Sequence, residues 1–180
     1  MARKFCSMGK LGAYKIDLKG QKEASASYGW VVDSDYFTAL DVEDIRRGRV
    51  NVSLDVTKVS NQFVLSFVLK GDVILQCDRC LDDMVQEIDT TGELKVRLGE
   101  DFADDGDVVV VPEQDGTINV SWYIYEFISL AVPLKHVHAP GKCNKAMSEE
   151  LDKYSASEED EGNSPSDPRW SELENLNLDD

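Results

Sequence analysis

The chain has 180 residues, enough for one core of ordinary size with a tail, and too few for two independent domains of usual length. No apolar run reaches the roughly 20 residues that a membrane-spanning helix needs, and the start Met1–Cys6 lacks the apolar segment of a signal peptide, so we expect a cytoplasmic protein without a membrane partner. A formal net charge of −16 argues against general nucleic-acid binding, and no DNA partner is expected.

The negative charge is concentrated at the C-terminal end of the chain. Residues 148–180 hold 12 acidic and 2 basic side chains, a net of −10, whereas residues 1–147 hold 23 acidic and 17 basic side chains, a net of −6. We therefore expect three segments: a flexible N-terminus over residues 1–10, one β-rich domain over residues 11–147, and an acidic disordered tail over residues 148–180.

Strand signals begin at Tyr14–Leu18 and Tyr28–Val32. Asp41, as a cap, and Gly48, as a stop, predict a short helix between them. After it the sequence alternates strictly between apolar and polar residues, first over residues 50–57 and then, beyond a turn at Asn61–Gln62, over residues 63–69. This alternation predicts an antiparallel hairpin with one buried face.

The glycines predict that the rest of the sheet region is divided into short strands. Gly71–Asp72 is interpreted as a turn and Thr91–Gly92 as a break, and a short buried run follows at Val108–Val111. Many short strands at close spacing predict an α+β fold, mainly an antiparallel β sandwich or a partly open barrel, with one long helix. That helix is expected from Val120 to Ala131, with Asn119 as its cap and Pro133 as its stop.

The two cysteines of Cys77-Asp78-Arg79-Cys80 fall at a bend between two extended segments. Thiolates at this spacing can bind one tetrahedral ion of the zinc type from a tight turn, but such a site needs two further ligands. Later in the chain His136, His138 and Cys143 are the candidates. The predicted metal ligands, with zinc as the candidate ion, are Cys77, Cys80, His138 and Cys143. Two alternatives stay open: a redox pair, and two buried thiols without a metal.

The segment 133–147 contains three lysines, two histidines and no acidic residue. If it lies beside the cysteine bend, it forms a cationic surface that could bind RNA phosphates; chance composition is the alternative. The predicted RNA-binding residues are Arg79, Lys135, Lys142 and Lys145.

The acidic tail ends in a helix signal. Asp167 is placed to cap a helix and Pro168 to begin it. An apolar edge of Trp170, Leu173 and Leu176 predicts a helix that docks either on the parent domain or on a partner.

Four features of the chain, taken in order, resemble the YceD family of large-ribosomal-RNA-subunit accumulation proteins. They are Cys77-Asp78-Arg79-Cys80-Leu81, the helix that runs into Leu130-Ala131-Val132-Pro133, the pair His138 and Cys143, and Asp167-Pro168-Arg169-Trp170. The resemblance implies a bacterial cytosolic protein that supports accumulation of large-subunit ribosomal RNA, with no enzymatic activity assigned. Family members often carry a second Cys-x-x-Cys late in the chain. This chain has Cys143-Asn144-Lys145-Ala146 there, so a metal would have to recruit a histidine.

The leading hypothesis is a non-catalytic ribosome-biogenesis factor that binds the large-subunit ribosomal RNA precursor or a ribosomal protein. One alternative is a protein–protein adaptor that docks through its C-terminal helix. Another is a metal-dependent enzyme that processes ribosomal RNA, for which the acidic loop at Asp101, Asp104, Asp105 and Asp107 would be the candidate metal site. No Ser-His-Asp pattern or phosphate-binding glycine motif supports an enzyme, so we predict none.

Overall fold

The structure, a computed structural model, describes residues 10–155 with the exception of residues 22, 46, 105 and 107. Two units are distinguished, Met1–Cys143 and Asn144–Asp180, and each is described by itself. The expected flexible N-terminus falls almost wholly outside the described residues, and so does the expected docking helix with Trp170, Leu173 and Leu176.

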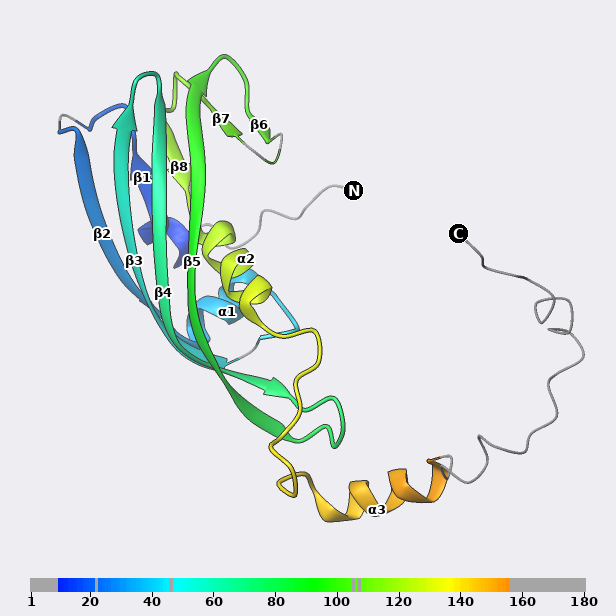
Figure 1. Cartoon of the computed structure of the whole chain (residues 1–180). Coiled ribbons are helices and arrows are strands. Elements are labelled where there is room, and N and C mark those ends of the chain that lie inside the picture. Colours follow the sequence, from blue (N-terminus) through cyan, green and yellow to red (C-terminus); the bar gives the residue numbers. More distant parts are fainter. Residues whose placement is uncertain (1–9, 22, 46, 105, 107, 156–180) are drawn as a thin grey trace, which may run out of the picture. The chain divides into compact units, whose positions relative to one another are not determined.

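A six-stranded open sheet forms the main part of the first unit (Figure 1). Its strands lie in the order β2-β3-β4-β5-β7-β6, and every neighbouring pair is antiparallel except β5 and β7. The strands are β2 (Ser25–Val32), β3 (Arg47–Val59), β4 (Gln62–Gln76), β5 (Asp83–Gly99), β6 (Ala103–Asp104) and β7 (Val108–Pro112). A separate two-stranded sheet pairs β1 (Lys15–Asp17) with β8 (Thr117–Asn119).

The central hairpin has the register that the alternation predicts. Val52 of β3 faces Leu69 of β4, and Leu54 faces Phe67, so that the apolar residues of both strands lie on one face. The predicted division at the glycines is wrong, because β4 runs through Gly71 and β5 through Gly92 without a turn. A Cβ atom at Gly71 would collide with the backbone of β3, so this glycine permits a close approach between two strands.

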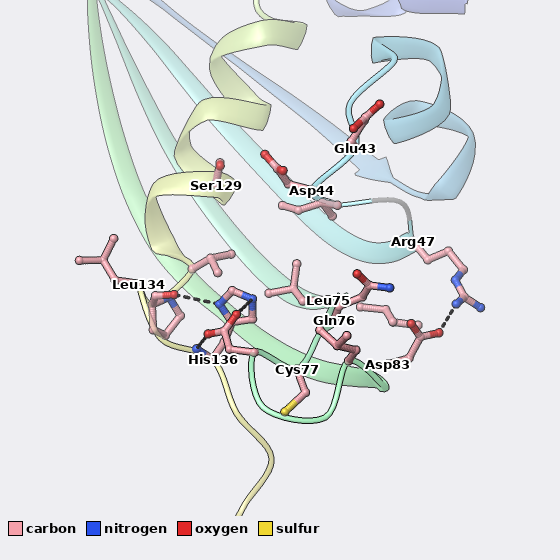
Figure 2. Close-up of a pocket in the computed structure, with 16 residues that line it drawn as sticks. Glu43, Asp44, Arg47, Leu75, Gln76, Cys77, Asp83, Ser129, Leu134 and His136 are labelled. Atoms are coloured by element: carbon pink, nitrogen blue, oxygen red, sulfur yellow. Dashed lines mark hydrogen bonds and ion pairs between the residues drawn. The ribbon is translucent and has the colours of Figure 1, made fainter. Parts of the chain in front are cut away.

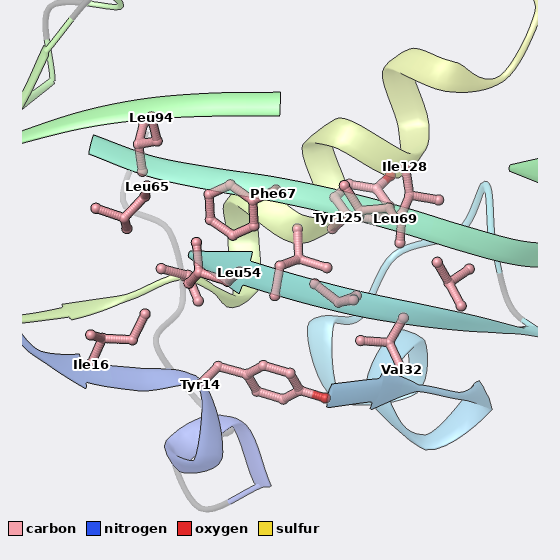
Figure 3. Close-up of a cluster of buried hydrophobic side chains, with 14 of the residues drawn as sticks. Tyr14, Ile16, Val32, Leu54, Leu65, Phe67, Leu69, Leu94, Tyr125 and Ile128 are labelled. Carbon is pink, nitrogen blue, oxygen red and sulfur yellow. The ribbon is translucent and has the colours of Figure 1, made fainter. Parts of the chain in front are cut away.

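Among the described residues, one face of the large sheet is covered by other elements. The apolar side chains of β3 and β4 share one core with the two-stranded sheet and with helices α1 (Ser34–Leu40) and α2 (Ser121–Ala131); Figure 3 shows part of this core. A short 3-10 helix, η1 (Lys10–Tyr14), also packs there. The fold is thus α+β and mostly sheet, as predicted. The second layer, however, consists of helices and a two-stranded sheet rather than the second large sheet of a sandwich.

Helix α1 is not where the sequence predicts it. It begins at Ser34 and is capped by the carboxylate of Asp33, which accepts hydrogen bonds from two backbone N–H groups. Asp41, predicted as the cap of a helix, instead ends α1 in a left-handed conformation, with φ 56°. An Asp residue favours both a helix start and a left-handed stop, and the local pattern alone does not separate the two.

Helix α2 is close to the prediction. The side chain of Asn119 accepts a hydrogen bond from the N–H of Ser121 at 2.9 Å, and Pro133 follows shortly after the last helical residue. Ile124 and Ile128 are fully buried in the core, and Gly92 leaves room for the ring of Phe127. No helix in the described part of the chain is long and apolar enough to cross a membrane.

The second unit contains a helix where the sequence predicts the start of the disordered tail. Helix α3 (Lys145–Tyr154) is capped by Asn144, whose side chain accepts hydrogen bonds from the N–H groups of Ala146 and Met147. It has no buried residue. The helix therefore depends on local capping and on the ion pair of Lys153 with Glu150 rather than on a core of its own.

Candidate metal centre

The first half of the site is a tight turn between β4 and β5. The backbone N–H of Cys77 donates to the carbonyl oxygen of Asp82 at 2.9 Å, and the N–H of Leu81 donates to the carbonyl oxygen of Cys77 at 2.9 Å. Leu81 closes the turn in a left-handed conformation with φ 62°. These bonds hold Cys77 and Cys80 on the same side of the turn, and both side chains are buried.

The second half is the segment that follows α2, and it is fastened to the cysteine turn by Asp78 and His136. The N–H of Asp78 donates to the carbonyl oxygen of His136 at 3.0 Å, and the N–H of His136 donates to the carboxylate of Asp78 at 2.8 Å. The imidazole of His136 also lies 3.3 Å from that carboxylate. This reciprocal pairing brings two segments nearly 60 residues apart into contact.

Beyond His136 the chain places His138 and Cys143 beside the two cysteines of the turn. The four ligand atoms of Cys77, Cys80, His138 and Cys143 all lie within 4.8 Å of one another. The sulfurs of Cys77 and Cys143 are 3.9 Å apart, and the sulfur of Cys80 is 3.3 Å from Nδ1 of His138. A tetrahedral zinc site with ordinary bond lengths requires sulfur–sulfur distances of about 3.8 Å and sulfur–nitrogen distances of about 3.5 Å. The described geometry therefore fits such an ion.

The surroundings of His138 also suit a metal ligand. Its Nε2 lies 3.3 Å from the backbone carbonyl oxygen of Asp83, so that this nitrogen carries the proton and Nδ1 faces the sulfurs as a donor of electrons. Its backbone N–H donates to the sulfur of Cys77 at 3.5 Å. A ligand histidine whose other nitrogen is held by a carbonyl is a recurrent arrangement at structural zinc sites.

The thiols of the cluster differ in acidity. Burial raises the pKa of the Cys77 thiol, but hydrogen bonds from backbone N–H groups outweigh this effect and lower the pKa to about 6. Those N–H groups belong to Cys80, His138 and Arg79. Burial and the neighbouring sulfurs raise the pKa of Cys143 to about 11. Because a metal binds thiolates, we expect the site to release protons when it takes up an ion.

His136, a candidate metal ligand by sequence, has a different role in the structure. It is not part of the cluster, and together with Asp78 it fastens the two segments instead. Asp78 was not among the residues predicted from the sequence. The only signal for it was its position inside the Cys-x-x-Cys motif, which does not reveal a partner nearly 60 residues away.

Three of the predicted RNA-binding residues lie on the two segments that meet at the cluster. Arg79, Lys135 and Lys142 are all exposed there. Lys145 is the first residue of α3 and belongs to the second unit. The exposed acids of the cysteine turn, Asp78, Asp82 and Asp83, stand among these cations, so the positive residues are interspersed with negative ones.

The acidic loop considered for an enzyme is only partly described. The carboxylate of Asp104 accepts hydrogen bonds from the N–H of Gly106 at 3.1 Å and from the hydroxyl of Tyr123 at 3.4 Å. Asp105 and Asp107 lie outside the described residues. In the described part of the chain, the cluster at Cys77 is the one group of Cys, His, Asp or Glu side chains close enough to hold an ion.

The fold and the site define a class: an α+β protein whose open sheet ends in a Cys₃His cluster shared by two distant loops. Comparison with known proteins narrows the class. The chain belongs to the YceD family, because residues 65–177 match the family described as "Large ribosomal RNA subunit accumulation protein YceD". It is also 31% identical over 138 residues to "Uncharacterized protein YlbN" of Bacillus subtilis (strain 168), covering 76% of this chain and 77% of that protein. No solved structure matches.

Proposed function

We propose that this protein is a non-catalytic, cytoplasmic factor that supports the accumulation of large-subunit ribosomal RNA by binding a component of the assembling subunit. The family match is the observation that carries this proposal, since the family description names that role. The component is the ribosomal RNA precursor or a ribosomal protein.

The Cys₃His cluster serves this function as a structural element. Cys77, Cys80, His138 and Cys143 would supply all four positions of a tetrahedral ion, which leaves no open position for a substrate or an activated water molecule. Zinc bound there would cross-link the cysteine turn to the segment after α2. The residues that contact the partner would then be held in place on a closed pair of loops.

The cations on these loops support contact with RNA phosphate. Arg79, Lys135 and Lys142 are exposed, and each is next in the chain to a candidate ligand or to the Asp78–His136 pair, which we call the clasp. Closure of the cluster therefore also positions these cations. Because phosphate contacts of Lys and Arg displace counterions, we expect these contacts to weaken as the salt concentration rises.

The experiment is complementation in bacterial cells depleted of the protein. We expect the ratio of large- to small-subunit ribosomal RNA to fall on depletion and to recover with the wild-type chain. The variant Cys80→Ser should fail to restore it, whereas Cys6→Ser, a substitution of the one cysteine that is not among the predicted ligands, should restore it. An unchanged ratio in depleted cells would contradict the proposed function. Cleavage of a ribosomal RNA precursor by the pure protein with a divalent metal would contradict the non-catalytic part.

A further inference from the structure

A pocket of about 660 Å³ lies beside the cysteine turn and is not used by the Cys₃His cluster, except that Cys77 forms part of its wall (Figure 2). Three segments line it: residues 43–45 with Arg47 after α1, the cysteine turn with the adjoining strand ends, and the segment from the end of α2 to His136. Figure 2 shows Glu43 and Asp44 opposite Cys77, with His136 and the Arg47–Asp83 ion pair on the two flanks. All three segments belong to the first unit.

The pocket is lined by both polar and apolar side chains, and two of the apolar ones are exposed leucines. Ile45 and Leu75 are buried among the lining residues. On the rim, Leu81 is 60% exposed and Leu134 is fully exposed. Two exposed leucines at one opening form an apolar surface that water solvates poorly, as is common where a partner binds.

The backbone of Leu81 strengthens this inference. Leu81 has φ 62°, a conformation that costs an ordinary residue about 1 kcal/mol or more and that glycine adopts freely. Glycine would therefore serve the turn better than leucine. The side chain gains little from its own fold, because most of it is exposed. A leucine that is unfavourable for the turn and poorly buried is best explained by a contact outside the chain.

The charge of the pocket selects the kind of partner. Its lining carries four carboxylates, but Asp83 is paired with Arg47 and Asp78 with His136, so Glu43 and Asp44 set the charge of the remaining wall. These two carboxylates repel phosphate groups and attract Lys and Arg side chains. The tail of the chain is also unsuited, because residues 156–180 contain nine acidic side chains and one arginine.

We propose that this pocket binds a basic segment of a protein partner, with an apolar side chain of that segment inserted between Leu81 and Leu134 and with Lys or Arg beside Glu43 and Asp44. The inference rests on the proposed function and specifies its partner, since proteins that bind ribosomal RNA must be rich in Lys and Arg. The cluster supports the pocket by holding Cys77 and the neighbouring Leu81 in position.

The test uses the full chain and synthetic peptides with a fluorescent label, with affinity measured by fluorescence anisotropy. The first peptide flanks a Leu-Phe pair with Lys and Arg. The second replaces Leu-Phe by Ser-Ser, and the third replaces Lys and Arg by Glu. We expect the first peptide to bind at least roughly tenfold more tightly than either of the others, because both the apolar and the cationic contacts are needed.

Variants of the protein separate the pocket from general attraction to an acidic chain. Leu81→Gly removes the side chain and relaxes the turn, so we expect roughly tenfold weaker peptide binding without any loss of thermal stability. Leu134→Ser should weaken binding in the same way. The matched control is Leu130→Ser, since Leu130 is 76% exposed but does not line the pocket. For the charges, Glu43→Gln should weaken binding, whereas Glu87→Gln, outside the pocket, should not.

Wild-type affinity in both Leu81→Gly and Leu134→Ser would overturn the proposal, because binding would then be general charge attraction. A second outcome would also overturn the proposal. This is the case if Leu81→Gly weakens the binding of an RNA oligonucleotide, or of a peptide of residues 156–180, and leaves the binding of the basic peptide unchanged. The proposed function fails separately. If the peptide binds as expected but ribosomal RNA levels do not depend on the protein, the pocket proposal stands and the proposed function is wrong. If the protein restores ribosomal RNA levels but does not bind the peptide, the proposed function stands and the pocket proposal is wrong.

Discussion

The centre of the sheet and the Cys₃His loops are stabilised in different ways. Alternate side chains are buried over residues 50–56 of β3 and 63–69 of β4, and the two strands pair from Arg47–Ile74 to Val59–Gln62, so that apolar burial holds this region together. In the loops most side chains are exposed, and four ligand side chains with the Asp78–His136 clasp hold the segments. The two regions should therefore lose their structure independently. The sheet should unfold when its packing is lost, and the loops should separate when the cross-link between them is lost.

The largest expected effect is on metal content. Cys77→Ser removes the most buried of the four ligands, so we expect elemental analysis to find about one zinc per chain in the wild type and essentially none in the variant. The far-UV circular dichroism of the sheet should be unchanged, whereas the segment from Pro133 to Cys143 should become sensitive to proteases. Cys6→Ser is the control and should keep the metal. Equal metal content in wild type and Cys77→Ser would contradict the assignment of the cluster.

A core substitution should have the opposite pattern. Phe67 is 1% exposed, and the centroid of its ring lies 5.2 Å from the centroid of the Phe127 ring. Phe67→Ala should therefore lower the free energy of unfolding by about 3–5 kcal/mol. Urea denaturation measures this loss, and the metal content should stay at the wild-type value. Val68→Ala, on the exposed face of the same strand, is the control and should cost about 0.5 kcal/mol or less. Similar losses in the two variants would show that the covered face of the sheet is not the main source of stability.

The smallest expected effect is at the start of α2, which leads from the sheet to the loops. Asn119→Ala removes the bond to the N–H of Ser121 and a second bond to the carbonyl oxygen of Leu11, and should cost about 1 kcal/mol in thermal or urea unfolding. Asn119→Asp keeps the acceptor for Ser121 and loses the donor to Leu11. It should therefore retain most of the stability, and an Asp variant as unstable as the Ala variant would assign the effect to Leu11 instead.

Much of the fold could be predicted because its signals are local. The alternation at residues 50–57 and 63–69 predicts the hairpin and its register, and the spacing from Val120 to Ala131 predicts α2 nearly to its ends. The errors also have local causes. Gly71 predicts a turn because glycine is common in turns, but here it allows two long strands to approach closely. Asp41 was assigned to the wrong end of a helix because Asp occurs at both ends.

The candidate site was predictable in its residue types, and the family resemblance carried by the same residues is confirmed by the match over residues 65–177. The ligand set followed from chemistry, since few side chains in the chain can bind a zinc-type ion beside Cys77 and Cys80. The Asp78–His136 clasp and the acidic pocket were not predictable. Each depends on residues that are far apart in the chain and individually unremarkable.

By itself, the sequence determined the buried face of the central hairpin, nearly the whole extent of α2 and the four candidate ligands, because these depend on residue type and short-range spacing. Only the tertiary structure decided that His138 and Cys143 reach the cysteine turn, that His136 does not join them, and that Leu81 and Leu134 line the same pocket. The physical reason is that proximity between distant segments is set by how strands and helices pack, and a local pattern carries no record of it.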